Sequence, residues 1–185
     1  MDRTEFLDKF EKALEQGLLK ICGYFNAVEP KIVTEGSTFI GPDLEDAWDK
    51  YVKDYVADAV ENFNSYPDSA IGFAAFLGMG VAHNWDKDWT THSSDPYASY
   101  YGDCGWDNMD DHILEEVLKL PEKDLKRFTQ CIQSCAAATQ TLMEKEQVEA
   151  GTELGFYVLA RSYTVMFRIG ASMELFRCGY RKTRI

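Results

Sequence analysis

The sequence lacks a segment long enough to cross a membrane and lacks the cysteine spacing of a zinc ribbon or a redox motif. Its longest uncharged run, residues 69–85, has 17 residues and three glycines, whereas a membrane-spanning helix needs about 20 apolar residues. No two cysteines are separated by two residues. Their odd number and apolar helical surroundings indicate small buried side chains rather than disulfide bridges. The cysteines are Cys22, Cys104, Cys131, Cys135 and Cys178.

Basic residues are scarce, and the acidic excess is concentrated in the first 112 residues. The net charge is −12. Residues 1–64 hold 7 Lys/Arg and 14 Asp/Glu, residues 65–112 hold 1 and 8, and residues 113–185 hold 11 and 9. An acidic surface repels the phosphate backbone, which argues against nucleic-acid binding. The simplest interpretation of this charge is solubility through self-repulsion, and attraction of a basic protein partner is the alternative.

Catalytic signatures are also missing. The chain has no Gly-rich phosphate loop, no nucleophile elbow and no H-E-x-x-H motif. It begins MDRTEFLDKF, which is charged and amphipathic and does not resemble a signal peptide. We therefore expect a cytoplasmic, reducing location and no membrane association.

Apolar residues recur at helical spacing along most of the chain, and no strand-period segment is visible. This pattern predicts an all-α fold, a single-domain bundle over residues 1–185 with about six helices. The helices are expected at residues 6–28, 43–63, 69–83, 107–118, 121–150 and 152–178. Residues 69–83 and 152–178 are apolar on nearly all sides, which predicts two buried central helices. We expect a loop at residues 31–42 and a long connection, rich in aromatic residues and aspartate, at 86–106.

The segment HNWDKDWTTH, residues 83–92, follows the first central helix and has two interpretations. Its side chains, with a further histidine downstream, could bind a divalent transition metal such as Zn, Mn or Fe through His83, Asp86, His92 and His112. Alternatively, His83 ends a buried helix while Trp85 and Trp89 cover the core. The spacing permits a metal site without requiring one, so we favour the second interpretation and expect no cofactor.

Two arginines lie on one face of the most apolar helix. Arg161 and Arg168 are seven residues apart, and a buried guanidinium without a partner costs several kcal/mol. The aspartate-rich connection is the expected partner, with a phosphate or carboxylate ligand as the alternative.

These observations leave two functional classes open. The favoured one is a non-enzymatic regulator, adaptor or inhibitor that binds a basic protein partner. Its candidate binding residues are Trp85, Asp86, Asp88, Trp89, His92, Trp106, Arg161 and Arg168. The alternative is a metal-dependent hydrolase with the His/Asp site at 83–112. A second copy of the chain is another candidate partner, in a homodimer that joins the basic segment Arg177, Arg181, Lys182 and Arg184 to the acidic half.

Overall fold

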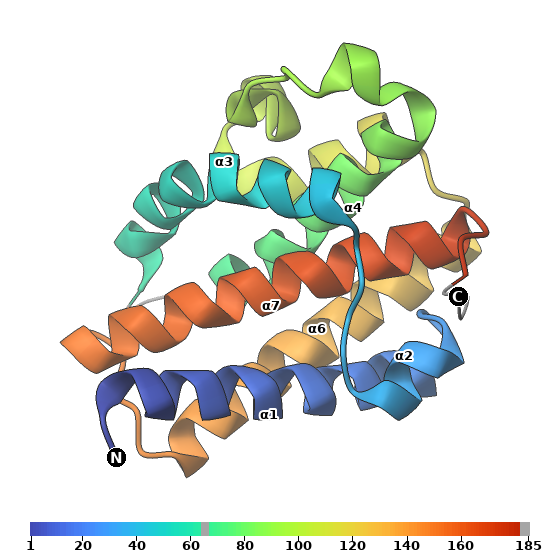
Figure 1. The fold of residues 1–185 in the computed structure, drawn as a ribbon. Helices are drawn as coiled ribbons and strands as arrows, with labels where there is room; N and C mark the ends of the chain where they lie inside the picture. Colours follow the sequence, from blue (N-terminus) through green and yellow to red (C-terminus); the bar gives the residue numbers. More distant parts are fainter. Residues whose placement is uncertain (64–66, 182–185) are drawn as a thin grey trace.

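The protein is all-α, as the sequence predicts. The structure is a computed structural model that describes residues 1–63 and 67–181, and over these residues it has seven α-helices and no strand (Figure 1). The helices are α1 (Arg3–Tyr24), α2 (Pro30–Glu35), α3 (Pro42–Ala59), α4 (Pro67–His92), α5 (Met109–Asp111), α6 (Glu122–Lys145) and α7 (Glu153–Arg177). A π-helix at His112–Leu118 continues α5. Within the described ranges, no helix is long and apolar enough to cross a membrane.

Helices α4 and α7 form the centre of the bundle, which confirms the two predicted buried helices. Every residue from 70 to 82 of α4 is buried. Helix α7 contacts α1, α3, α4 and α6, and it runs between α1 and α3 in Figure 1. One cluster of buried apolar side chains includes members from α1, α3, α4, α6 and α7. The long helices therefore share one core.

Glycines allow α4 and α7 to touch through their backbones. A Cβ atom added at Gly78 would lie 2.1 Å from the carbonyl oxygen of Phe167. One added at Gly170 would lie 1.8 Å from the carbonyl oxygen of Ala75. Neither position has room for a methyl group, because ordinary contact distances begin near 3.4 Å. The two helices cross where each presents a glycine to the other.

Two predicted connections contain helix. Residues 31–42, expected to be a loop, include most of α2, which has Pro30 in its first turn and ends at Gly36 with φ of 71°. Proline suits a first helical turn, and glycine accepts the left-handed conformation that ends a helix. Helix α4 continues nine residues past its expected end at His83, as far as His92. The long connection therefore begins after His92, and it consists largely of short 3-10 turns.

Candidate functional site

The segment HNWDKDWTTH is mostly helical, with one break. Asp88 has φ of −168° and ψ of 90°, which is extended backbone and kinks the end of α4. Its carboxylate accepts hydrogen bonds from the backbone N–H of Thr91 at 3.3 Å and from the hydroxyl of Thr91 at 2.6 Å. These bonds lower the pKa of Asp88. Asp88 is therefore engaged as a cap of the last turn of the helix.

The structure does not bring the four candidate metal ligands together. Each histidine faces a different carboxylate: His83 faces Glu174 at 3.8 Å, His92 faces Asp95 at 2.7 Å, and His112 faces Glu116 at 3.3 Å. The fourth candidate, Asp86, accepts a hydrogen bond from the Tyr180 hydroxyl at 2.7 Å. Among the described residues, one group of three candidate ligand atoms lies close together, and it consists of cysteine thiols in the core.

The tryptophans of this region pack against the core. Trp85 donates from Nε1 to Asp43 at 3.0 Å, and its ring contacts that of Tyr180. Trp89 and Trp106 are partly buried against the apolar cluster. The ring of Trp106 lies 5.0 Å from that of Phe73. These contacts support the interpretation in which aromatic residues cover the central helix.

Arg161 and Arg168 do meet carboxylates, but the expected source of these carboxylates was wrong. Arg161 contacts Asp8 at 2.9 Å and Glu11 at 2.6 Å. Arg168 contacts Glu11 at 3.3 Å and Glu45 at 3.0 Å. These acids belong to α1 and α3 rather than to the aspartate-rich connection. Both arginines therefore join neighbouring helices. Their ion pairs neutralise the guanidinium charges that would otherwise attract a phosphate or carboxylate ligand.

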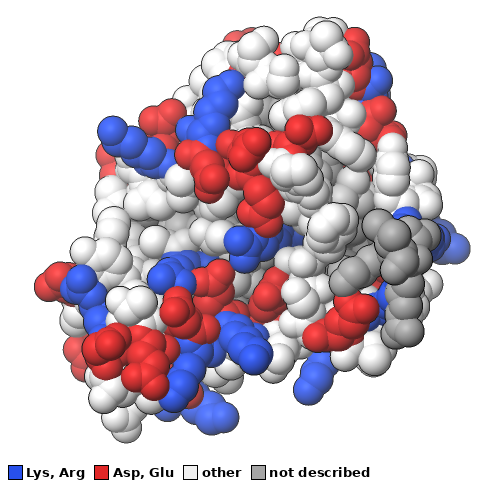
Figure 2. Space-filling model, in the orientation of Figure 1, with Lys and Arg blue, Asp and Glu red and all other residues white. Residues whose placement is uncertain are grey.

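The acidic surface predicted from the charge distribution includes one face of α3. This helix carries six Asp/Glu and two Lys, and acidic side chains gather over it in Figure 2, whereas acidic and basic side chains alternate over α1 and α7. Lys50 reaches the backbone oxygens of Ser93 and Asp95. That contact ties the connection after α4 to α3, so both contribute to one acidic surface.

A pocket of about 370 Å³ opens on this surface between α3 and the turn at Tyr97–Tyr100. Asp54 and Asp58 line it from successive turns of α3, and Tyr97 and Tyr101 line it from the connection. The two tyrosine rings meet edge to face at 5.4 Å. None of the lining residues is basic; the others are Ala57, Pro96 and Ala98.

The electrostatics of this pocket are unbalanced. Partial burial raises the pKa of Asp58, and the negative charges of Asp54 and Glu61 add to this effect, whereas the nearby hydroxyl of Tyr97 acts in the opposite direction. The Tyr97 hydroxyl is buried and lies near Asp58 without forming a well-directed hydrogen bond. Burial and the charge of Asp58 in turn raise the pKa of Tyr97. A cation in the pocket would offset this negative charge.

The sequence interpretation did not single out these four residues. Asp54 and Asp58 are four positions apart, as are Tyr97 and Tyr101. The spacing places the two aspartates on one helix face, which is a usable signal. The two tyrosines cover the same helix face because the connection folds back over α3. No local sequence pattern predicts this folding.

The basic C-terminal segment is only partly described. Arg177 pairs with Glu174 at 2.5 Å, and Arg181 donates to the backbone oxygens of Phe176 and Tyr180. Lys182 and Arg184 lie outside the described residues.

The chain matches no family model, no curated protein and no solved structure.

Proposed function

We propose that the protein binds a basic protein partner through the acidic surface of α3 and the connection after α4. A lysine or arginine side chain of the partner enters the pocket between Asp54 and Asp58. The observation that carries this proposal is the pocket itself, which joins two carboxylates and two tyrosine rings with no basic residue among its lining. We expect this interaction in the cytoplasm, where the free thiols of the described cysteines stay reduced.

A cation fits this pocket for electrostatic reasons. The raised pKa of Asp58 reports partial burial and repulsion from like charges, and a bound ammonium or guanidinium group relieves that repulsion. Two unit charges 4 Å apart interact by roughly 4 kcal/mol at the effective dielectric constant of a protein surface. The faces of Tyr97 and Tyr101 can add cation–π attraction of about 0.5–1 kcal/mol. Desolvation of the incoming cation offsets part of this gain.

A protein suits the surface better than a nucleic acid does. The net charge of −12 repels phosphate. Tyrosine is enriched among the residues that dominate protein–protein binding energies, and complementary charge mainly raises the association rate. The association rate should therefore fall as salt concentration rises.

Selection of displayed random peptides on the full chain tests this proposal. Enriched peptides should be net basic and should depend on one lysine or arginine. Their affinity for the D54N/D58N variant, measured by fluorescence anisotropy, should fall at least about 10-fold, the equivalent of about 1.4 kcal/mol. The matched control is D46N/D49N, which removes the same charge from exposed positions of the same helix and should cost about 2-fold.

Equal losses for the two double variants would show that the long-range charge acts without the pocket, and would contradict the proposed anchor. Enrichment of neutral or acidic peptides would contradict the basic partner. Analytical ultracentrifugation over a range of protein concentrations tests whether the chain forms a homodimer. A dimer that dissociates in the D54N/D58N variant would identify a second copy of the chain as the partner.

A further inference from the structure

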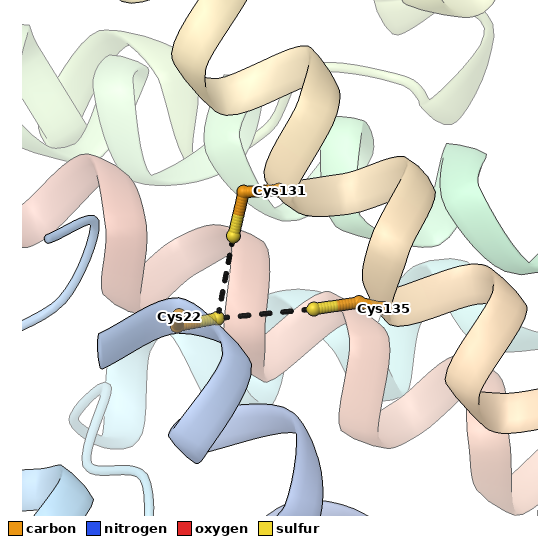
Figure 3. A group of neighbouring side chains, drawn as sticks. All are labelled: Cys22, Cys131 and Cys135. Carbon is orange, nitrogen blue, oxygen red and sulfur yellow. Dashed lines mark hydrogen bonds between the residues drawn. The ribbon is translucent and has the colours of Figure 1, made fainter. Parts of the chain in front are cut away.

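Three cysteine thiols meet in the core between α1 and α6. Figure 3 shows Cys22 of α1 pointing toward Cys131 and Cys135 of α6. The Sγ atom of Cys22 lies 3.7 Å from that of Cys131 and 3.9 Å from that of Cys135. All three side chains are fully buried, and their sulfur atoms lie within 4.8 Å of one another. We call these residues the thiol cluster.

Helix geometry and the packing of α1 on α6 build the thiol cluster. Cys131 and Cys135 are four positions apart, so they share one face of α6. Cys22 follows Leu18 and Leu19 on the buried face of α1. One turn before Cys131 lies Arg127, whose Nη2 donates to Asp124 at 3.2 Å and whose Nε is buried and makes no hydrogen bond within the described residues. Hydrogen bonds among the three thiols lower the pKa of Cys131, whereas hydrogen bonds to Cys131 and burial raise the pKa of Cys22 and of Cys135.

We propose that the thiol cluster is a three-coordinate binding site for a thiophilic metal ion, and that Cu(I) is the ion it fits. A metal–thiolate bond of about 2.3 Å places three sulfurs about 4.0 Å apart around a planar three-coordinate ion. The distances from the Cys22 sulfur to the other two sulfurs are within a few tenths of an ångström of that value, and the third separation is at most 4.8 Å. Soft thiolate ligands select Cu(I) and Zn among common metals.

Coordination number decides between these two metals. Structural zinc sites are almost always four-coordinate. Within the described residues, no fourth His, Cys, Asp or Glu joins the group, and full burial leaves little room for a water ligand. Each protonated thiol releases its proton on binding the metal. With three thiolates, the Cu(I) site carries a net charge of −2, and the nearby cation is Arg127, which also pairs with Asp124.

A surface groove lies about one helical turn from the thiol cluster. It has a volume of about 230 Å³, lies between α1 and α6, and includes Gly17 and Ala138. Its lining also includes Leu18 and Leu142. Leu18 is one turn from Cys22, and Ala138 is three residues from Cys135.

Anaerobic titration of the freshly reduced full chain with Cu(I) tests the site, in competition with a chromophoric Cu(I) chelator. The wild type should take up one Cu(I) per thiol cluster, with new thiolate-to-copper absorption in the ultraviolet. The C22S variant should lose that uptake, because Cys22 contacts both other thiols. The control C178S, whose thiol lies outside the cluster and contacts Glu174, should keep it. A parallel titration with Zn(II) should show weaker binding.

A second measurement does not depend on how well the variants fold. A ligand that binds only the native state raises its stability by mass action. At free Cu(I) 100-fold above Kd, the Tm of the wild type should rise by about 5–10 °C. The proposal fails if the wild type binds no Cu(I), if folded C22S binds Cu(I) as well as C178S does, or if Zn(II) binds more tightly than Cu(I).

Discussion

A methyl group at the crossing of α4 and α7 should strongly destabilise the protein. In the Gly170→Ala variant the new Cβ would start 1.8 Å from the carbonyl oxygen of Ala75, so the helices must separate by about 1.5 Å to reach an ordinary contact distance. A radial gap of 0.5–1 Å already loses a quarter to a half of the dispersion energy of each atom pair. The higher helix propensity of alanine offsets about 1 kcal/mol of the lost packing energy. The net loss should be about 2–4 kcal/mol.

Urea and thermal unfolding followed by circular dichroism measure this change. A loss of 2–4 kcal/mol corresponds to a decrease in Tm of roughly 5–15 °C for a chain of this size. Gly17→Ala is the matched control: Gly17 lies inside α1, and an added Cβ has no atom within 4 Å, so its Tm should rise by about 2–4 °C. If Gly170→Ala is as stable as the wild type, the backbones of α4 and α7 do not lie as close together as the distance at Gly170 requires.

Three further results are expected. Glu174→Ala removes the fully buried partner of Arg177 and should lower the free energy of unfolding by about 3 kcal/mol, whereas Glu153→Ala, at an exposed pair, should change it by less than about 0.5 kcal/mol. Burial raises the pKa of Asp110, so the folded form binds the Asp110 proton more tightly than the unfolded chain does. The contribution of Asp110 to stability is therefore lost as pH rises above about 4, and in urea titrations Asp110→Asn should lose less stability than the wild type over the same rise in pH. The far-ultraviolet spectrum should be helical, and any substantial sheet signal would contradict the fold.

The sequence predicted those parts of the fold that depend on local spacing. Helix α6 shows an apolar stripe that needs no knowledge of its neighbours, and α4 and α7 reveal their burial by lacking a polar face. The end of α4 was missed because its polar residues, from Asp86 onward, were interpreted as a loop. A helix that extends beyond the core gains a polar surface without ending, so composition alone does not locate the boundary.

Partners distant in the chain were the main failure of the sequence interpretation. Arg161 and Asp8 are separated by 153 positions, and no local pattern connects them. The need of an arginine for a carboxylate was predictable from burial, but the carboxylate itself was not. The thiol cluster shows the same limit. The four-residue spacing of Cys131 and Cys135 can be read from the sequence, whereas the position of Cys22 beside them depends on how α1 packs on α6.

The central place of α7 affects how the protein is made. Helix α7 follows every other described helix in the chain, yet it contacts α1, α3, α4 and α6. During synthesis, α4 therefore emerges long before α7, which covers it. Its apolar residues 70–82 cannot be fully buried until about 90 more residues have been synthesised. Until then the nascent chain offers a binding surface to chaperones and proteases. Ribosome stalling before α7 should leave a product that aggregates or is degraded, whatever the stability of the finished fold.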